Sequence, residues 1–394
     1  MEILYISSVV SDRLFEQLYK QSKTSGNVGQ KYHGMFVKGL AANLGHPLTV
    51  LSQPPTSARF LRFDDENSTN NIKFKYIPII PIPIVKQIVS FFYNFFYTLY
   101  WSIKNLGQEK VVICSLMRIY QIIPSFYISR IFRSKIITVV CDIPRLTIFQ
   151  ATNRKPSLKS RLLIYLSEKF DSKFDGYVLL TEAMNSIVNP KSKPYIVIEG
   201  FSDIEMEKYS NHLSNKNSHN IILYAGGLNI NYGIQMLVEA FKRINKPNSE
   251  LWLYGNGDFS NQLINEKDDR IKYFGQKLNK EVVEAEIRAK VLINPRPTSG
   301  EFTHYSFPSK TLEYMSTGTF TITTKLAGIP SDYFNYCGVI NEESIEGIGN
   351  ALSFYLDMDQ NTLHAKGLEA KEYVLKYKNN ITQTKKVLHF LSEL

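Results

Sequence analysis

The sequence predicts an α/β protein built from two doubly wound, Rossmann-like halves. Three observations predict this class: short apolar runs alternate with helical patterns, the runs form two series, and a polar stretch separates the series. The runs are rich in β-branched residues and too short to cross a membrane, which is typical of buried parallel strands. The chain of 394 residues is long enough for two domains. Strands that alternate with helices in this way form an open parallel sheet.

The expected elements fall into place along the chain. The first half has apolar runs at 3–9, 48–52, 73–77, 111–115, 136–141 and 176–181. The second half has runs at 221–225, 250–254, 271–274, 291–294 and 320–324, with helices expected at 234–244 and 280–288. A linker is expected near 194–220. We therefore predict an N-terminal domain over residues 1–195, a C-terminal domain over 196–375, and a Lys-rich final helix over 376–394 that packs back toward the N-terminal domain.

Charge and cysteine content narrow the functional classes. The 46 Lys and Arg residues exceed the 36 Asp and Glu residues, which gives a net charge of +10. Such a balance suits nucleic acid, an anionic membrane or an anionic substrate, and composition alone does not choose among them. Cys114, Cys141 and Cys337 are far apart, so neither a disulfide framework nor a zinc site is indicated. The N-terminal residues MEILYISSVV lack the basic region and long apolar segment of a signal peptide, and a cytoplasmic location is expected.

The most apolar part of the chain is segment 77–105, and two interpretations of it stay open. Its prolines prevent a helix before Ile84, and beyond them polar residues recur at every fourth position on an otherwise apolar helix: Lys86, Ser90, Asn94, Thr98 and Ser102. The apolar length is at the lower limit for spanning a bilayer, and the polar stripe argues against spanning. Residues 84–103 are therefore either a core helix of the first domain or an interfacial helix that contacts the inner face of the membrane.

Two glycine-containing turns follow strands of the second half, where ligands of open α/β sheets bind. The run at 221–225 leads into Gly226 and Gly227 and then a helix, and the run at 250–254 leads into Gly255 and Gly257. A glycine pair lets a phosphate approach the backbone, and a helix N-terminus offers free N–H groups. A structural turn is the alternative explanation.

Residues 291–330 carry the most informative pattern. Arg296 stands between two prolines directly after a strand, which holds its side chain at the carboxyl edge of the sheet. A helix is expected to begin near Pro308, with Ser309 as its cap, and it places Lys310 and Glu313 on one face. A cation in the first turn of a helix opposes the dipole unless an anion binds there, so Lys310 suggests a bound diphosphate. A simple surface pair of Lys310 and Glu313 is the alternative.

The stretch FPSKTLEYMSTGT followed by TKLAGIPSDY resembles the donor-site signature of family 4 glycosyltransferases, in the branch that builds bacterial surface polysaccharides. YAGGLNINYGIQMLVEAF, LWLYGNGD and, more loosely, SGNVGQKYHGMFVKGLAANLGHPLTVLS are similar to further motifs of that family. The resemblance implies a GT-B fold, with two facing domains, a cleft between them and a C-terminal helix that crosses back. It also implies a retaining, metal-independent transfer from a nucleotide sugar, with a UDP-linked donor expected, to a glycan or lipid-linked oligosaccharide acceptor.

The resemblance also assigns roles to individual residues of the donor site. Glu313 matches the second glutamate of the family's E-x7-E motif and would accept hydrogen bonds from the donor ribose. Tyr305 occupies the position of the first glutamate, and Glu301 lies nearby at the wrong spacing. The places of the family's usual Arg and Lys hold Gly227 and Tyr232, so Arg296 and Lys310 are the expected replacements. The residues expected to bind the donor are Gly226, Gly227, Gly255, Arg296, Phe307, Pro308, Ser309, Lys310 and Glu313.

On the first domain, the expected acceptor-binding residues are Gly29, Gln30, His33 and Asp142. Asp142 ends the run IITVVCD and is expected at the carboxyl edge, where it holds the transferred sugar or the acceptor, or else caps the next segment. His33 is a candidate acceptor contact or a solvated loop residue. Glu199 ends the run YIVIE at the crossing between the domains, where a hinge role is favoured over a contact with the donor sugar. The pair Asp357 and Asp359 is interpreted as a chance match to a metal motif, so no metal site is expected.

The expected catalytic residues are Asp142, Arg296, Lys310 and Glu313. In the retaining course, the leaving diphosphate takes the acceptor proton while Arg296, Lys310 and the helix N-terminus stabilise its charge. The alternative is a non-catalytic nucleotide-sugar-binding partner of another transferase, which the missing first glutamate suggests. Nucleic-acid binding is set aside because no groove-reading module is present.

Overall fold

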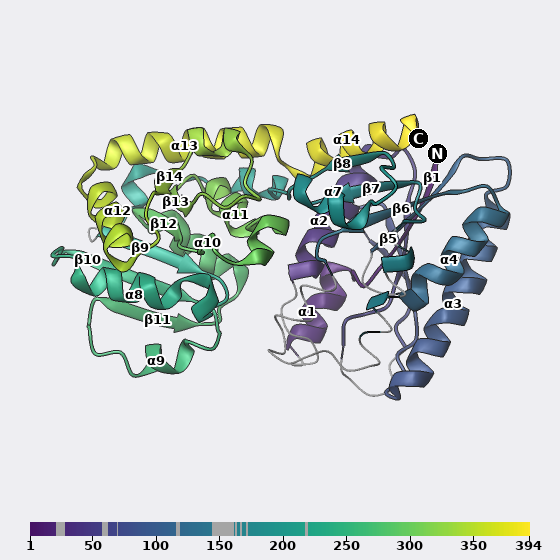
Figure 1. Ribbon diagram of the computed structural model, residues 1–394, viewed down its shortest axis with the longest axis horizontal. Helices are drawn as coiled ribbons and strands as arrows, with labels where there is room; N and C mark the ends of the chain where they lie inside the picture. Colours follow the sequence, from purple (N-terminus) through teal and green to yellow (C-terminus); the bar gives the residue numbers. More distant parts are fainter. Residues whose placement is uncertain are drawn as a thin grey trace. The chain divides into compact units, whose positions relative to one another are not determined.

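The computed structural model describes residues 1–20, 28–56, 62–68, 70–115, 119–143, 161, 164–165, 168–170, 172–216 and 220–394. The chain divides into two compact units. Unit 1 contains Met1–Phe201 together with Asn380–Leu394, and unit 2 contains Ser202–Asn379. Each unit is built around its own sheet (Figure 1).

The sheet of unit 1 is parallel except at one edge, where β3 runs antiparallel to β4. Its order is β3 (Glu66–Ser68), β4 (Ile72–Tyr76), β2 (Leu48–Ser52), β1 (Glu2–Ser7), β5 (Lys110–Ser115), β6 (Lys135–Val140), β7 (Gly176–Leu179) and β8 (Tyr195–Val197). The central strands are buried on both faces, as their continuous apolar runs require. Short elements follow β7, namely η1 (Glu182–Met184) and α7 (Asn185–Val188).

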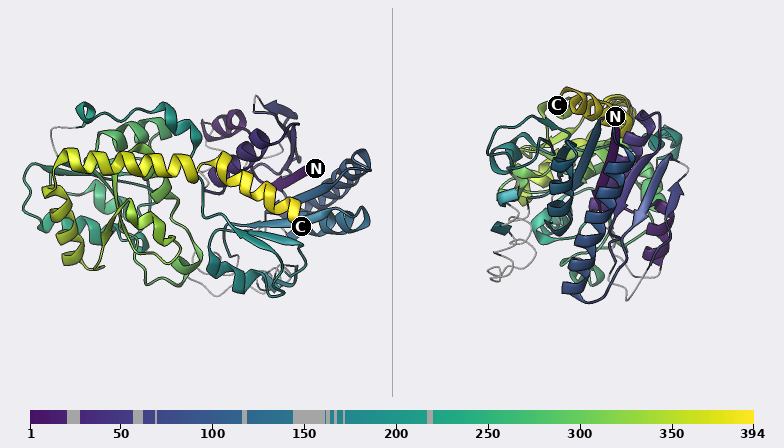
Figure 2. Two further views of the ribbon diagram at one scale, coloured as in Figure 1. Left: turned by 90° about the horizontal axis from the view of Figure 1, so that it is seen from above. Right: turned by 90° about the vertical axis from the view of Figure 1, so that its right-hand side faces the viewer.

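The C-terminal helix α14 (Asn380–Glu393) belongs to unit 1, where it packs on α2 (Val28–Asn43) beside α1 (Asp12–Lys20). Figure 2 shows α14 lying over this part of unit 1, far along the sequence from it. A side chain at Gly39 would come within 2.2 Å of the Asn380 carbonyl, so the crossing of α2 and α14 requires a glycine there. The Asn43 amide also donates to the Ile381 carbonyl at 2.9 Å.

Two further helices of unit 1, α3 (Pro83–Lys104) and α4 (Ile119–Ile131), lie side by side (Figures 1 and 2). Helix α3 begins at Pro83, one residue earlier than expected, because proline is well suited to the first helical position, where its missing N–H is not needed. The core-helix interpretation of α3 is wrong: Phe92, Phe96 and Tyr100 are each more than half exposed. Among the described residues, no helix combines the length and the apolar character needed to cross a bilayer.

The sheet of unit 2 is parallel throughout. Its order is β11 (Ile271–Gly275), β10 (Ser249–Tyr254), β9 (Asn220–Ala225), β12 (Val291–Asn294), β13 (Phe320–Thr324) and β14 (Gly338–Ile340). The α-helices of unit 2 are α8 (Ile234–Arg243), α9 (Ser260–Ile264), α10 (Asn279–Arg288), α11 (Ser309–Thr317), α12 (Ile345–Asp357) and α13 (Gln360–Tyr377). Its 3₁₀ turns are η2 (Ile204–Lys208), η3 (Leu213–Asn215), η4 (Ile230–Tyr232), η5 (Glu301–Tyr305) and η6 (Ser331–Asn335). The predicted fold class, α/β with two Rossmann-like domains, is confirmed.

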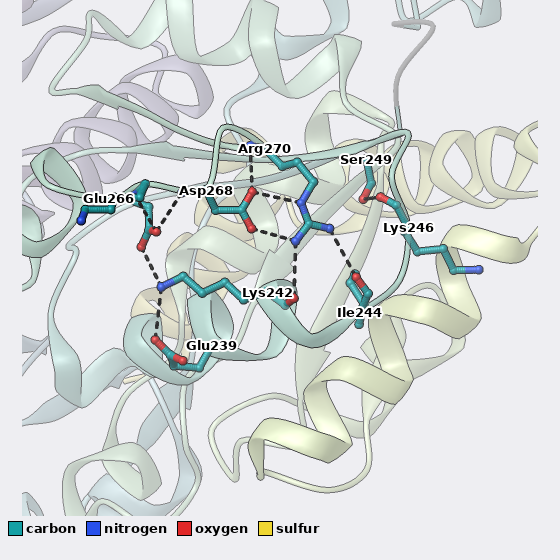
Figure 3. Close-up of polar contacts among 9 residues, drawn as sticks. Glu239, Lys242, Ile244, Lys246, Ser249, Glu266, Asp268 and Arg270 are labelled. Atoms are coloured by element: carbon teal, nitrogen blue, oxygen red, sulfur yellow. Dashed lines mark hydrogen bonds and ion pairs between the residues drawn. The ribbon is translucent and has the colours of Figure 1, made fainter.

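An ion-pair cluster fastens the amino edge of the unit 2 sheet (Figure 3). Arg270, just before β11, forms two hydrogen bonds to the Asp268 carboxylate, at 3.0 and 2.7 Å, and donates to the Ile244 carbonyl at 3.3 Å. Its guanidinium lies 5.0 Å from the centre of the Phe241 ring. The cluster joins the end of α8 to the start of β11 and so uses several charges structurally, at the edge of the sheet opposite the strand ends described below.

Candidate functional site

The carboxyl edge of the unit 2 sheet is built on close backbone contacts between neighbouring turns. Gly255 has φ = +122°, and a side chain there would meet the Gly226 carbonyl at 1.9 Å. Gly233, the N-cap of α8, has φ = +79°, and a side chain there would meet the Pro295 carbonyl at 2.3 Å. Gly255 therefore holds the end of β10 against the Gly226–Gly227 turn, which gives it a packing role, and Gly233 lets the start of α8 approach the turn after β12.

Arg296 lies between two aromatic rings at this edge. Its guanidinium carbon is 4.4 Å from the centre of the Tyr232 ring and 5.1 Å from that of Phe302. Its carbonyl accepts a hydrogen bond from Thr324 Oγ1 at 2.5 Å, which ties the turn after β12 to β13. The two rings restrict the position of the guanidinium, and a guanidinium can bind a phosphate through two parallel hydrogen bonds.

Lys310 and Glu313 pair on the first turns of α11. Lys310 Nζ lies 2.6 Å from Glu313 Oε2, as their i, i+3 spacing predicts. Burial opposes the charge of Lys310, but the nearby carboxylates of Glu313 and Glu286 outweigh it and raise the pKa of the ammonium group above its usual value. Lys310 therefore stays charged between two carboxylates. The pair leaves open the donor-site interpretation, because a bound diphosphate could share the same cation.

The start of α11 differs from the expectation. Pro308 is the N-cap and Ser309 is the first helical residue, and no side chain caps the helix. The prediction that Ser309 caps α11 is therefore wrong. The N-cap residue supplies no side-chain acceptor to the first turn, where the Thr311 N–H donates to the Pro308 carbonyl at 2.9 Å. The start of a helix without a side-chain cap suits an anionic ligand. The Phe307 side chain is buried against Tyr333, with ring centres 5.6 Å apart, so only its backbone can line the site.

Tyr224 shows that these parts lie together. Burial raises the pKa of its phenol to about 12, while the positive charges of Lys310 and Arg296 act in the opposite direction. Its hydroxyl donates to the Gly227 carbonyl at 2.9 Å. The structure thus brings the predicted Gly226–Gly227 turn, Arg296, Lys310 and Glu313 to one region.

Sequence reasoning missed the residues that support this region. They are Tyr224, Phe302 and Glu286, and the role of Tyr232 as a platform for Arg296. The available signal was Glu286, a carboxylate among the apolar positions of the helix at 280–288, which is 2% exposed. A buried carboxylate favours a nearby cation, and the charge of Glu286 acts on Lys310. Tyr305, in the place of the first glutamate of the motif, lies in η5, and Glu301 at the start of that turn is exposed.

In unit 1, His33 lies at a buried position on helix α2 and not in a loop as expected. His33 is 5% exposed, its Nδ1 is hydrogen-bonded to the Tyr5 hydroxyl, and its Nε2 lies 3.8 Å from Cys141 Sγ. Burial lowers the pKa of His33 to about 4, so the ring is neutral at physiological pH. The expectation of a solvated loop residue is therefore wrong. The ring packs inside unit 1 against Tyr5 and Cys141.

The other unit 1 candidates have different surroundings. Gly29 and Gln30 lie in the first turn of α2, and the Gln30 side chain bonds both the N–H and the carbonyl of Val10, at 3.1 and 2.8 Å. Glu199 is buried and accepts a hydrogen bond from Gln383 of α14 at 3.3 Å. Asp142 lies two residues beyond the end of β6 and is exposed as a residue. Loss of hydration around its carboxyl group still raises the pKa to about 6.

The two aspartates of the late motif have structural partners. Asp357 pairs with Lys246, and Asp359 caps α13 by accepting from the Thr362 N–H at 2.9 Å. Within the described part of the chain, no three His, Cys, Asp or Glu side chains lie close enough together to hold a metal ion.

Comparisons with known proteins match this architecture. Residues 219–357 match the family described as glycosyl transferases group 1. A search of curated proteins finds no significant match. Among solved structures, the chain is similar over its whole length to three proteins, each also matched over its whole length. They are a sucrose-phosphate synthase from Thermosynechococcus elongatus (TM-score 0.71, 16% identity), a UDP-forming α,α-trehalose-phosphate synthase from Burkholderia xenovorans in complex with glucose-6-phosphate (0.66, 12%), and Anabaena HepE in complex with UDP and glucose (0.63, 13%).

The structural likeness establishes the fold, and the family match places the glycosyltransferase domain on the sheet that carries Arg296, Lys310 and Glu313. The chain therefore has a GT-B fold, carries a glycosyl transferases group 1 domain over residues 219–357, and is a glycosyltransferase.

Proposed function

We propose that this protein is a retaining glycosyltransferase that moves a sugar from a UDP-linked donor to a hydroxyl of a lipid-linked bacterial surface glycan. The observation that carries the proposal is the grouping of Arg296, Lys310 and Glu313 at the carboxyl edge of a group 1 glycosyltransferase domain. Two structural neighbours support a UDP-linked donor, since one is described as UDP-forming and another as complexed with UDP and glucose. The acceptor assignment rests on the sequence resemblance to family 4 enzymes of surface-polysaccharide synthesis.

The site supplies the charges that this reaction needs. Arg296 and Lys310, with the N–H groups at the start of α11, would neutralise the donor diphosphate and its developing negative charge. Glu313 would accept hydrogen bonds from the ribose hydroxyls while it keeps Lys310 in place. The proposed course has the sugar–phosphate bond break as the acceptor oxygen bonds the anomeric carbon on the same face, and the leaving phosphate takes the acceptor proton.

A nucleotide-sugar panel tests the donor assignment. We expect UDP-sugars to raise the melting temperature of the protein more than GDP- or ADP-sugars do, because a ligand stabilises the state that binds it. The stabilising donor should then support transfer or slow donor hydrolysis in EDTA, since Arg296 and Lys310 are proposed to replace a metal. No stabilisation by any nucleotide sugar would contradict the donor proposal, and strict dependence on a divalent cation would contradict the metal-independent course.

A second candidate function is a non-catalytic partner that binds nucleotide sugar for another transferase. The observation that favours it is Tyr305, which replaces a carboxylate of the family motif. Donor turnover by the purified protein separates the two candidates. Tight donor binding with neither hydrolysis nor transfer would favour the partner.

The pH dependence of transfer tests the proposed role of Asp142. If the Asp142 carboxylate accepts a hydrogen bond from the acceptor or the transferred sugar, kcat/KM rises as pH increases through about 6, where the group ionises. Asp142→Asn should remove this component of the pH profile and lower kcat/KM above pH 6 by about 10- to 100-fold, the effect of losing a hydrogen bond to a charged group. His33 does not interfere, because its pKa is about 4. A variant with the wild-type pH profile would exclude the role.

A further inference from the structure

Helix α3 buries its polar side and exposes its apolar side, the reverse of a usual surface helix. The polar stripe, Ser90, Asn94, Thr98 and Ser102, is completely buried. The opposite side, here called the outer face of α3, is exposed and consists of Ile84, Ile88, Phe92, Phe96, Tyr100 and Ile103. A surface helix in water presents polar residues outward and apolar residues inward. The outer face of α3 is therefore built for contact with an apolar medium.

The buried stripe packs against α4 through small polar side chains. Thr98 Oγ1 lies 3.4 Å from Ser125 Oγ, and the Gln121 amide donates to Ser90 Oγ at 3.3 Å. Small residues let two helices approach closely and bond to each other, a packing common between helices in lipid. The partner helix extends the apolar surface with Tyr127 and Ile131, which are 53% and 70% exposed.

The outer face is also hollowed. A groove of about 500 Å³ runs along it, lined entirely by α3 side chains between Ile88 and Tyr100. Its walls are apolar and largely aromatic, and phenylalanine and tyrosine are well suited to the boundary between lipid headgroups and acyl chains. A contiguous exposed apolar patch on a protein surface often marks an interaction site.

The charges around the outer face point to one kind of occupant. Lys86 and Lys104 stand near the two ends of α3, and neither α3 nor α4 contains Asp or Glu. Arg130, near the end of α4, pairs with Asp175 at 2.9 Å and so adds no net charge to this face. Asp65, whose charge acts on Tyr97, pairs with Lys75. A second copy of the same face would bring like charges together, whereas an anionic bilayer offers an apolar interior below a layer of negative headgroups.

We propose that the outer face of α3 seats unit 1 on the surface of an anionic lipid bilayer, with the helix lying in the plane of the interface. The aromatic and aliphatic side chains enter the boundary of the acyl chains, and the basic residues contact the headgroups. None of this depends on the donor or the sugar. A membrane seat would also concentrate the enzyme where a lipid-linked acceptor lies, and that consequence rests on the proposed function.

Vesicle co-sedimentation tests the proposal without any nucleotide sugar. The full chain should sediment with phosphatidylglycerol–phosphatidylcholine vesicles at low salt, and much less with phosphatidylcholine alone. Phe92→Gln with Phe96→Gln should lower the partition coefficient at least about tenfold, because two partly buried rings are lost from the interface. The matched control is Phe354→Gln, which removes an equally exposed ring, 64% exposed, from α12 of unit 2 and should bind like wild type.

A second variant, Lys104→Gln, tests the contribution of charge and should weaken binding to the anionic vesicles only. Its control is Lys277→Gln, on the exposed surface of unit 2. Circular dichroism and melting temperature check the fold, and slowed amide exchange in α3 of the wild-type protein upon vesicle addition gives a readout without variants. No vesicle binding, unchanged binding of the double Phe variant, or self-association through this face without lipid binding would each overturn the proposal. Failure of the transferase assay would leave these results unaffected.

Discussion

Replacing Glu313 by Gln is expected to lower kcat/KM for sugar transfer by about 10- to 100-fold while unit 2 stays folded. The glutamine keeps the shape of the side chain but loses the charge that would accept hydrogen bonds from the ribose and hold Lys310 at 2.6 Å. Hydrogen bonds to a charged group contribute about 1.5–3 kcal/mol, which corresponds to rate losses of this size. Initial rates with the stabilising donor measure the loss, and a variant with wild-type turnover would refute the site assignment.

Lys310→Met should reduce transfer by a similar or larger factor and also destabilise unit 2. Lys310 pairs with Glu313 and is also under the charge of Glu286, which is 2% exposed, so removing the ammonium takes a nearby positive charge from a buried carboxylate. Loss of activity could then reflect unfolding. The double variant Lys310→Met with Glu286→Gln separates the effects, because it removes the uncompensated charge.

The double variant should regain most of the melting temperature and none of the transfer activity. Recovery of both would show that Lys310 acts only on stability. If Lys310→Met alone keeps both the melting temperature and the transfer activity of the wild type, the Lys310–Glu313 pair is a surface contact without function.

The local parts of this site were predictable because they depend on spacing. The pairing of Lys310 with Glu313 follows from an i, i+3 separation on one helix. The position of Arg296 follows from a strand that ends before two prolines. The supporting residues were not predictable, because they come from distant parts of the chain. The Tyr314 hydroxyl, for example, accepts from the Ala225 N–H at 2.8 Å, and no periodicity links those two residues.

Among the strands, too, those with a clear local pattern were predicted and those without one were missed. The long buried runs match β5 and β12 to within a residue, since hydrophobic burial on both faces alone defines them. The three-residue strands β3 and β14 were missed because so few residues leave no pattern. For α3, the four-residue repeat of polar side chains was visible in the sequence, but the repeat does not tell whether the polar side faces the protein or the solvent. Only the contacts of Ser90 and Thr98 with α4 show that the polar side faces inward.

Part of the net charge of +10 has two proposed uses. Arg296 and Lys310 are proposed to meet a diphosphate, and Lys86 and Lys104 to meet lipid headgroups. Arg270 and Lys242 pair with Asp268 and Glu266 at the amino edge of the unit 2 sheet, so these two cations add nothing to the excess.

Acidification should weaken unit 1 by about 3 kcal/mol through His33 alone. The pKa of His33 is about 4 in the folded protein, against an ordinary value of 6.5, because its buried ring resists protonation. The unfolded chain therefore binds the proton more readily. The stability from the neutral ring is present above pH 6.5 and is lost as pH falls to about 4, a difference of about 3 kcal/mol.

Urea unfolding at pH 7 and pH 4, followed by tryptophan fluorescence, measures this loss of unfolding free energy. Trp101 is buried in unit 1 and Trp252 lies in unit 2, so Trp252→Phe leaves Trp101 to report on unit 1. In that background His33→Gln should lower the pH dependence of unfolding by about 3 kcal/mol, since Gln does not titrate. His389→Gln, at a position 74% exposed on α14, is the matched control and should leave it unchanged. Equal pH dependence in the His33 and His389 variants would show that protonation of the buried ring does not limit the acid stability of unit 1.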